Sequence, residues 1–289
     1  MASASKELVF HFPIAAEPSK VLKTLRTLEY AEEPILTAKE LDDLTFEQNT
    51  DTNRFNEARS LAQIYLGLLE APKSGIILTP RAYVILNKRE NIQYDLLHFL
   101  FTVAWSAKNL TQLTRSWFYR VLCERLWAMQ EIALDLETRR TLTQEIDNQL
   151  RLDFQEASDS IASVSLGIQT MDGAIEWLRH LSPVVLEASE KRTWLFHRRS
   201  VCSPELFILA LSHSYQTSGA ELNMDVLISP QRREETCRLC LLDPLQFDRM
   251  LDLTLPLYTR FINPGTRSGS YGRFVRFHRF VAIEDLSLK

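Results

Sequence analysis

The 289-residue chain lacks the motifs that identify common enzyme classes. It contains no His-Glu-x-x-His, no Gly-x-Ser-x-Gly and no Gly-x-x-x-x-Gly-Lys-Ser/Thr sequence. The glycines at 265, 269 and 272 are not followed by the lysine and hydroxyl residue of a phosphate-binding loop, which excludes a nucleotide-binding loop there. The sequence therefore predicts a protein that is not an enzyme and shows no evident small-molecule substrate.

Long apolar stretches are also absent. No run approaches the ~20 apolar residues that a membrane-spanning helix needs, and the first residues lack the apolar segment of a signal peptide. These absences predict a cytoplasmic protein with no membrane partner. A hydrophobic content of 45% and a charged content of 24% are typical of a folded globular protein long enough for more than one domain.

Cysteine is scarce, and two of the four cysteines form the pair Cys237-Arg238-Leu239-Cys240. A structural zinc site needs four ligands, and the other candidates nearby in sequence are Cys202, His197 and His213. No second Cys-x-x-Cys pair exists, and this one lies in a predicted helix. The sequence therefore predicts neither a metal nor a cofactor, and the cysteines fit small buried hydrophobes in a reducing compartment.

The stretch from Glu17 to Arg89 has the clearest local pattern. Apolar residues at helical spacing predict helices over about 18–31, 38–44 and 52–66, with Thr37 as the N-cap of the second. Two short strands, 68–70 and 76–78, flank a turn, and Thr79-Pro80 starts one more helix.

Three helices followed by a hairpin resemble the winged helix-turn-helix DNA-binding superfamily. The resemblance is carried by the Thr37 cap, the Asn53–Gln63 helix, the Gly67–Glu70 strand and the Ile77–Pro80 segment. It implies that the third helix enters the major groove while the wing touches the backbone. Side chains of the types that read base edges stand at Arg54, Asn56, Arg59 and Gln63.

Residues 91–165 are predicted to form a helical middle region. The helices expected over 94–107 and 113–136 are apolar and aromatic on most faces, and a helix over 141–157 would cover them. The aromatic residues are interpreted as core, not as a base-stacking surface. The small polar segment 158–165 is the predicted junction with the next region.

Residues 166–289 are predicted to form a helical domain that ends in a second, weaker winged-helix-like module. The expected helices cover 174–181, 184–196, 205–215, 230–240 and 245–255. A strand is expected at 226–228, and a hairpin over 261–283 around the turn-rich segment 263–272. The predicted fold is therefore mainly α, with winged-helix modules bearing small β-hairpins on either side of a helical bundle, and with domains at 1–90, 91–165 and 166–289.

The net charge of −4 is unevenly distributed. Acidic residues outnumber basic ones between Glu29 and Glu57, whereas the segment from Thr254 to Ile283 contains no acidic residue. Its basic side chains include four in and beside the predicted hairpin: Arg267, Arg273, Arg276 and Arg279. The lack of a nearby acid favours phosphate contact. The alternative is that these arginines pair with acidic residues elsewhere in the chain.

The sequence thus predicts a non-catalytic protein that binds double-stranded DNA through a basic C-terminal hairpin, together with a protein partner or a second copy. In general character it resembles accessory subunits of prokaryotic DNA-handling or defence complexes. The alternative is a protein-docking scaffold or adaptor whose winged helices bind protein, which the acidic second helix and the apolar helices between 94 and 127 favour. An enzyme component whose site leaves no motif is a third hypothesis.

Overall fold

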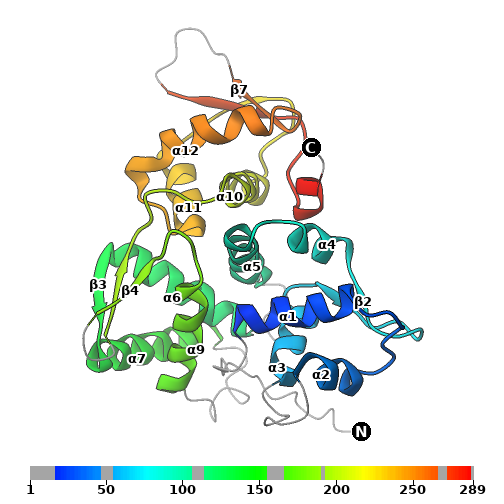
Figure 1. The fold of residues 1–289 in the computed structure, drawn as a ribbon. Coiled ribbons are helices and arrows are strands. Elements are labelled where there is room, and N and C mark those ends of the chain that lie inside the picture. Colours follow the sequence, from blue (N-terminus) through cyan, green and yellow to red (C-terminus); the bar gives the residue numbers. More distant parts are fainter. Residues whose placement is uncertain are drawn as a thin grey trace, which may run out of the picture.

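The computed structural model describes residues 17–46, 55–105, 114–154, 166–189, 193–265 and 272–287. The protein is mainly helical with small antiparallel sheets, as predicted. Side chains from all six ranges join one continuous hydrophobic core. Figure 1 shows the N-terminal, middle and C-terminal elements arranged around the central helix α5. Within the described ranges, no helix has the length and apolar composition that crossing a membrane requires.

The N-terminal elements are three helices, a two-stranded hairpin and a fourth helix. In chain order they are α1 (Pro18–Glu29), α2 (Ala38–Phe46), α3 (Phe55–Ser60), a π-helical turn (Leu61–Tyr65), β1 (Leu69–Glu70), β2 (Ile77–Leu78) and α4 (Pro80–Leu86). β1 and β2 pair antiparallel. The predicted order of elements is confirmed here, and the β-prone run 8–14 and the turn 48–51 lie outside the described residues.

The helix boundaries of this region follow from capping. The Thr37 hydroxyl accepts a hydrogen bond from the Glu40 N–H at 3.1 Å, and Thr79 caps α4 through the Ala82 N–H at 3.4 Å. Gly67 has a φ of +60°, which glycine adopts without strain, and the preceding helix ends there. Both predicted caps and the predicted stop are confirmed.

The middle elements include a strand that the sequence did not predict. They are α5 (Glu90–Ala104), α6 (Thr114–Met129), β3 (Glu131–Leu134), α7 (Leu136–Asp153) and α9 (Ile168–Arg179). The expectation that one helix runs on to Leu136 is wrong, because Gln130 adopts a left-handed φ of 67° and ends the helix. The predicted junction 158–165 lies outside the described residues.

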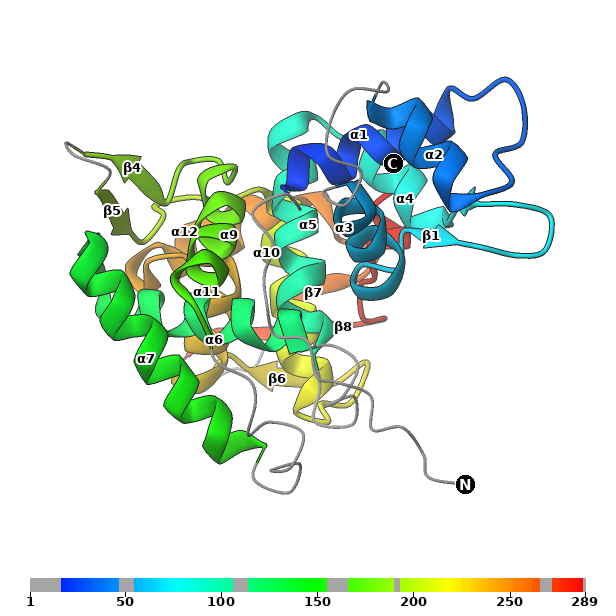
Figure 2. The same cartoon turned by 90° about the horizontal axis from the view of Figure 1, so that it is seen from below.

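The helix expected over 184–196 is also wrong. This segment contains the strands β4 (Leu186–Ala188) and β5 (Trp194–His197), which join β3 in an antiparallel sheet of order β3-β5-β4. Phe196 is fully buried opposite Ile132. Packing of apolar side chains in the sheet therefore determines the structure of this segment, although its apolar residues are spaced as in a helix. Because β3 pairs with β5, this sheet links segments on both sides of the domain boundary predicted near 165. Figure 2 shows β4 and β5 near α7, at one edge of the molecule.

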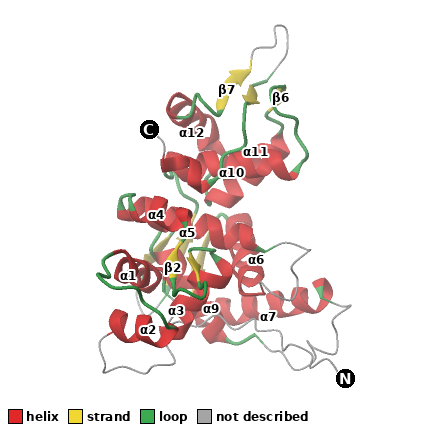
Figure 3. Cartoon of the chain, turned by 90° about the vertical axis from the view of Figure 1, so that its right-hand side faces the viewer, coloured by secondary structure: helices red, strands yellow, loops and turns green. Residues whose placement is uncertain are grey.

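The C-terminal elements end in a second three-stranded sheet. They are α10 (Pro204–Thr217), β6 (Asp225–Leu227), α11 (Pro230–Cys240), α12 (Phe247–Thr254), β7 (Ile262–Gly265) and β8 (Phe274–Phe277). β8 lies between β6 and β7 and pairs antiparallel with both. The expected helices and strands of this region are confirmed at these positions. Figure 3 shows β7 at the opposite end of the molecule from α3.

A buried polar network holds these elements against α5. The Arg199 Nη1 lies 2.6 Å from the Asp95 Oδ1, and the Ser203 hydroxyl donates to the Asp95 Oδ2 at 2.7 Å. Arg199 also donates to the Cys240 carbonyl at the end of α11. The Arg199 and Asp95 side chains are 0% and 1% exposed, so this pair joins α5, α10 and α11 inside the core.

The last described turn of the chain packs on the N-terminal elements. The 3-10 segment Ile283–Ser287 contacts α4, and Figure 1 shows it beside that helix. The Arg81 Nε lies 2.9 Å from the Glu284 Oε1, and the Lys88 Nζ donates to the Leu286 carbonyl at 3.0 Å. The last described turn is therefore in contact with an element about two hundred residues earlier in the chain.

Candidate nucleic-acid interface

Arg276 lies in the middle strand of the C-terminal sheet, directly opposite Asp225 of β6. Its Nε and Nη2 atoms each lie 3.0 Å from one oxygen of that carboxylate. The hydrogen bonds and charge of Asp225 raise the pKa of Arg276, because they stabilise the protonated guanidinium. A side chain at Gly265 would place a Cβ 2.8 Å from the Asp225 Oδ1, so glycine leaves room for the pair.

Arg273 forms ion pairs with two carboxylates of α12. It contacts Asp252, and its Nη1 lies 3.4 Å from the Asp248 Oδ1. Asp248 is also held by Arg233 of α11, with Nη1 2.7 Å from Oδ2. The hydrogen bond from Arg233 is the main reason that the pKa of Asp248 is lowered, while the bond to Asp252 chiefly raises the pKa of Arg273. These ion pairs connect α11, α12 and the residue that precedes β8.

Arg279 follows β8 and pairs with Asp285 of the C-terminal turn. Its guanidinium lies 5.2 Å from the centroid of the Phe261 ring, against which Arg260 also stacks at 4.5 Å. Arg267 lies outside the described residues.

The three described arginines of the C-terminal set, Arg273, Arg276 and Arg279, therefore share one property. Each has an acidic partner from outside the basic segment: Asp225, Asp248, Asp252 and Asp285. The sequence argument for phosphate contact was the lack of an acid nearby in the chain. Folding supplies those acids from other elements, and acidic and basic residues are equal in number over 204–289. The assignment of Arg273, Arg276 and Arg279 to DNA stays a prediction, without the unpaired charge that motivated it.

The N-terminal candidates lie far from this hairpin, since α3 and β7 stand at opposite ends of the molecule (Figures 1 and 3). The Arg59 Nε lies 3.1 Å and 3.3 Å from the two oxygens of Asp42, a residue of α2. Burial raises the pKa of Asp42 despite the opposing effect of Arg59. Gln63 is half-buried, whereas Arg54 and the side chain of Asn56 lie outside the described residues. The structure thus does not bring the two predicted sets together.

The outer side of α12 exposes apolar side chains that charge patterning along the sequence does not reveal. Phe247, Met250 and Leu251 point into the core. Three leucines on and beside the same helix are exposed by 86%, 49% and 64%, and we call them the α12 leucine surface: Leu245, Leu253 and Leu257. A search for base-reading donors passes over such residues, because they carry no polar group.

Cys237 and Cys240 are buried in α11, and burial raises the pKa of both thiols. Over the described ranges, no group of three or more His, Cys, Asp or Glu side chains is arranged to hold a metal ion.

Comparison of the chain with protein-family models, with curated proteins and with solved structures gave no match.

Proposed function

We propose that this chain is a non-catalytic docking subunit whose C-terminal elements form a winged helix that binds a protein surface instead of a DNA groove. The order α10, β6, α11, α12, β7, β8 supports a winged helix, since three helices are closed by an antiparallel hairpin. The ion pairs from Arg273 to Asp248 and Asp252 place that hairpin beside α12. The N-terminal elements have a similar order and are the second candidate module.

The α12 leucine surface is the observation that supports docking to protein. In a DNA-binding module of this kind, a helix lies in the major groove and phosphates are met by cations. Here α12 exposes Asp252 and Leu253 beside Arg249. Carboxylates repel phosphates, whereas exposed apolar side chains with a polar rim are typical of protein interfaces.

A photoreactive amino acid placed at position 253 tests this proposal in the native host. We expect a discrete adduct of higher mass after irradiation, because a docked partner would cover Leu253. Position 216, exposed on α10, provides the matched control and should give no such adduct. The absence of an adduct at 253, or equal adducts at both positions, would contradict docking through this surface.

DNA binding by the hairpin is the second candidate function. The observation that favours it is the solvent exposure of the hairpin's arginine side chains. The side chains of Arg273, Arg276 and Arg279 remain 38%, 42% and 57% exposed in their ion pairs. Exposed ion pairs contribute only about 0–1 kcal/mol, so phosphates can exchange with these carboxylates. A subunit of a prokaryotic DNA-handling or defence complex is a setting in which this activity would serve.

Binding to a generic DNA duplex, measured by fluorescence anisotropy at two salt concentrations, separates the two functions. The docking proposal predicts no binding even at low salt. Salt-dependent binding by the unmodified protein that is lost in the triple variant Arg273→Ala/Arg276→Ala/Arg279→Ala would replace it with the DNA function. Binding that persists in the triple variant would place the DNA site elsewhere on the chain.

A further inference from the structure

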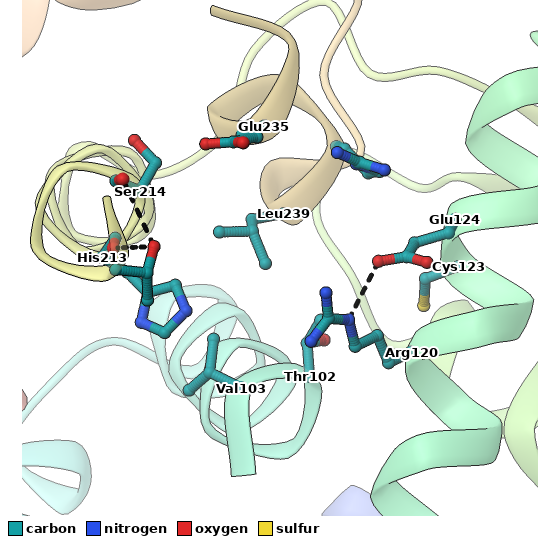
Figure 4. A pocket seen from close by; sticks show the side chains of 11 residues that line it. Thr102, Val103, Arg120, Cys123, Glu124, His213, Ser214, Glu235 and Leu239 are labelled. Carbon is teal, nitrogen blue, oxygen red and sulfur yellow. Dashed lines mark hydrogen bonds and ion pairs between the residues drawn. The ribbon is translucent and has the colours of Figure 1, made fainter. Parts of the chain in front are cut away.

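A cavity of about 260 Å³ lies where α5, α6, α10 and α11 meet. In the view of Figure 4, Arg120 of α6 and His213 of α10 lie on either side of the space bordered by Val103 and Leu239. Arg238, in the last turn of α11, also lines the cavity. The cavity therefore joins two helices of the middle region to two helices of the C-terminal region.

The acidic side chains of this lining already have basic partners. The Glu124 Oε1 accepts from the Arg120 Nε at 2.9 Å. The Glu235 Oε2 accepts from the Arg232 Nη1 at 2.9 Å, and Arg232 does not line the cavity. One positive charge of the lining is left without a counter-charge.

That charge belongs to Arg238. Its side chain is half-buried, and across the described ranges its guanidinium has no ion pair, no hydrogen bond and no aromatic contact. A guanidinium presents five N–H donors, and two of them can bind the two oxygens of one oxyanion. An arginine in this position is open to a ligand that brings its own negative charge.

His213 offers a second donor to the same cavity. The His213 ring packs edge to face against the Phe99 ring, with 6.0 Å between the two ring centroids. Within the part of the chain that the structure describes, the His213 ring makes no hydrogen bond. Burial, followed by the charge of Arg120, lowers the pKa of His213, so the ring is neutral at pH 7 and keeps one N–H. An oxyanion between His213 and Arg238 would satisfy both groups.

We propose that this cavity binds a small molecule bearing an oxyanion, a carboxylate or a phosphate, with Arg238 as the ion-pairing residue and His213 as a neutral donor. Val103 and Leu239 contact the apolar part of the ligand. The sequence carries no sign of a small-molecule ligand, because the lining comes from four helices with no shared motif. The ligand would brace α10 and α11 against α5 and α6, and this site is independent of the α12 leucine surface.

Thermal unfolding at constant ionic strength, in separate titrations with inorganic phosphate and with acetate, tests the site. We expect a saturable rise in the unfolding midpoint with at least one of these anions, because a ligand that binds only the folded state stabilises it. The anion that gives the rise identifies the carboxylate or phosphate class. No saturable rise with either anion would overturn the proposal.

Arg238→Gln should abolish that rise. The matched control is Arg249→Gln, since Arg249 is an exposed arginine of α12 without an ion pair among the described residues, and it should leave the rise unchanged. Val103→Trp narrows the cavity without changing its charge and should also abolish the rise, which covers the case in which Arg238→Gln fails to fold. An undiminished rise in either cavity variant would overturn the assignment.

Discussion

At the scale of single residues, the ion pair between Arg199 and Asp95 carries the largest expected cost of substitution. Asp95→Ala leaves a fully buried guanidinium without its counter-charge. We expect a loss of about 3–5 kcal/mol in the free energy of unfolding, measured by urea denaturation. Arg279→Ala removes an exposed arginine from its ion pair and should cost less than about 1 kcal/mol. Equal costs would show that the buried network does not stabilise the fold.

His98 makes stability depend on pH. It lies between the Tyr119 hydroxyl at 2.8 Å and the Leu239 carbonyl at 3.0 Å, and burial lowers its pKa from 6.5 to about 4. The unfolded chain takes up a proton near pH 6.5, which the folded protein resists. The stabilisation is therefore fully present above pH 6.5 and is lost as the pH falls toward 4, by on the order of 3 kcal/mol.

The variant His98→Gln tests this dependence. Its free energy of unfolding should fall less steeply with acid than that of the unmodified protein, when both are measured by urea denaturation over the same pH range. An unchanged slope would assign the acid sensitivity to other groups.

Residue identity alone could not predict these roles. The sequence shows Arg199 in a run of basic residues with no sign that its partner is Asp95, 104 positions away. Arg273, Arg276 and Arg279 show the same limit, because their acidic partners lie outside the basic segment. Whether two charged side chains pair depends on the distance between them in the folded protein. The order of charges along the sequence does not give that distance.

At the scale of elements, two serines begin helices in the same way but in different surroundings. Ser203 caps α10 through the Leu206 N–H at 3.2 Å and also donates to Asp95. Ser229 caps α11 through the Arg232 N–H at 3.3 Å, and its hydroxyl makes no other hydrogen bond among the described residues. Ser229→Ala should lower the free energy of unfolding by about 1 kcal/mol. Ser203→Ala should lower it by about 2 kcal/mol or more, because the Ser203 variant also loses a buried hydrogen bond. Urea denaturation of both variants compares them, and equal costs would contradict this ranking.

The helices that begin at a clear cap were predicted well, whereas the sheet β3-β5-β4 was not. Thr37 and Thr79 act within a few residues, so their signal is present in the local sequence. Trp194 and Phe196 become strand residues because β3 provides partners sixty or more positions earlier, Leu134 and Ile132. The α12 leucine surface and the cavity around Arg238 were missed for the same reason, since both depend on how helices are placed together.

At the scale of the whole molecule, the contact between α4 and the turn Ile283–Ser287 joins the N-terminal elements to the last described turn. Ile283 is 3% exposed, so Ile283→Ala should lower the free energy of unfolding by about 2–5 kcal/mol. We also expect faster amide hydrogen exchange in α4, which loses part of its cover. Ser287→Ala, at an exposed position of the same turn, is the control and should change neither measurement. Unchanged exchange in α4 would show that the contact does not stabilise that helix.

The same contact sets an order of events during synthesis. The ribosome releases α4 well before the segment that covers it. Until then, about two hundred residues of chain separate the two halves of this interface. The N-terminal elements therefore acquire their final packing only after translation has reached the last described turn, and a prematurely terminated chain exposes an unfinished surface on α4 to quality-control proteases.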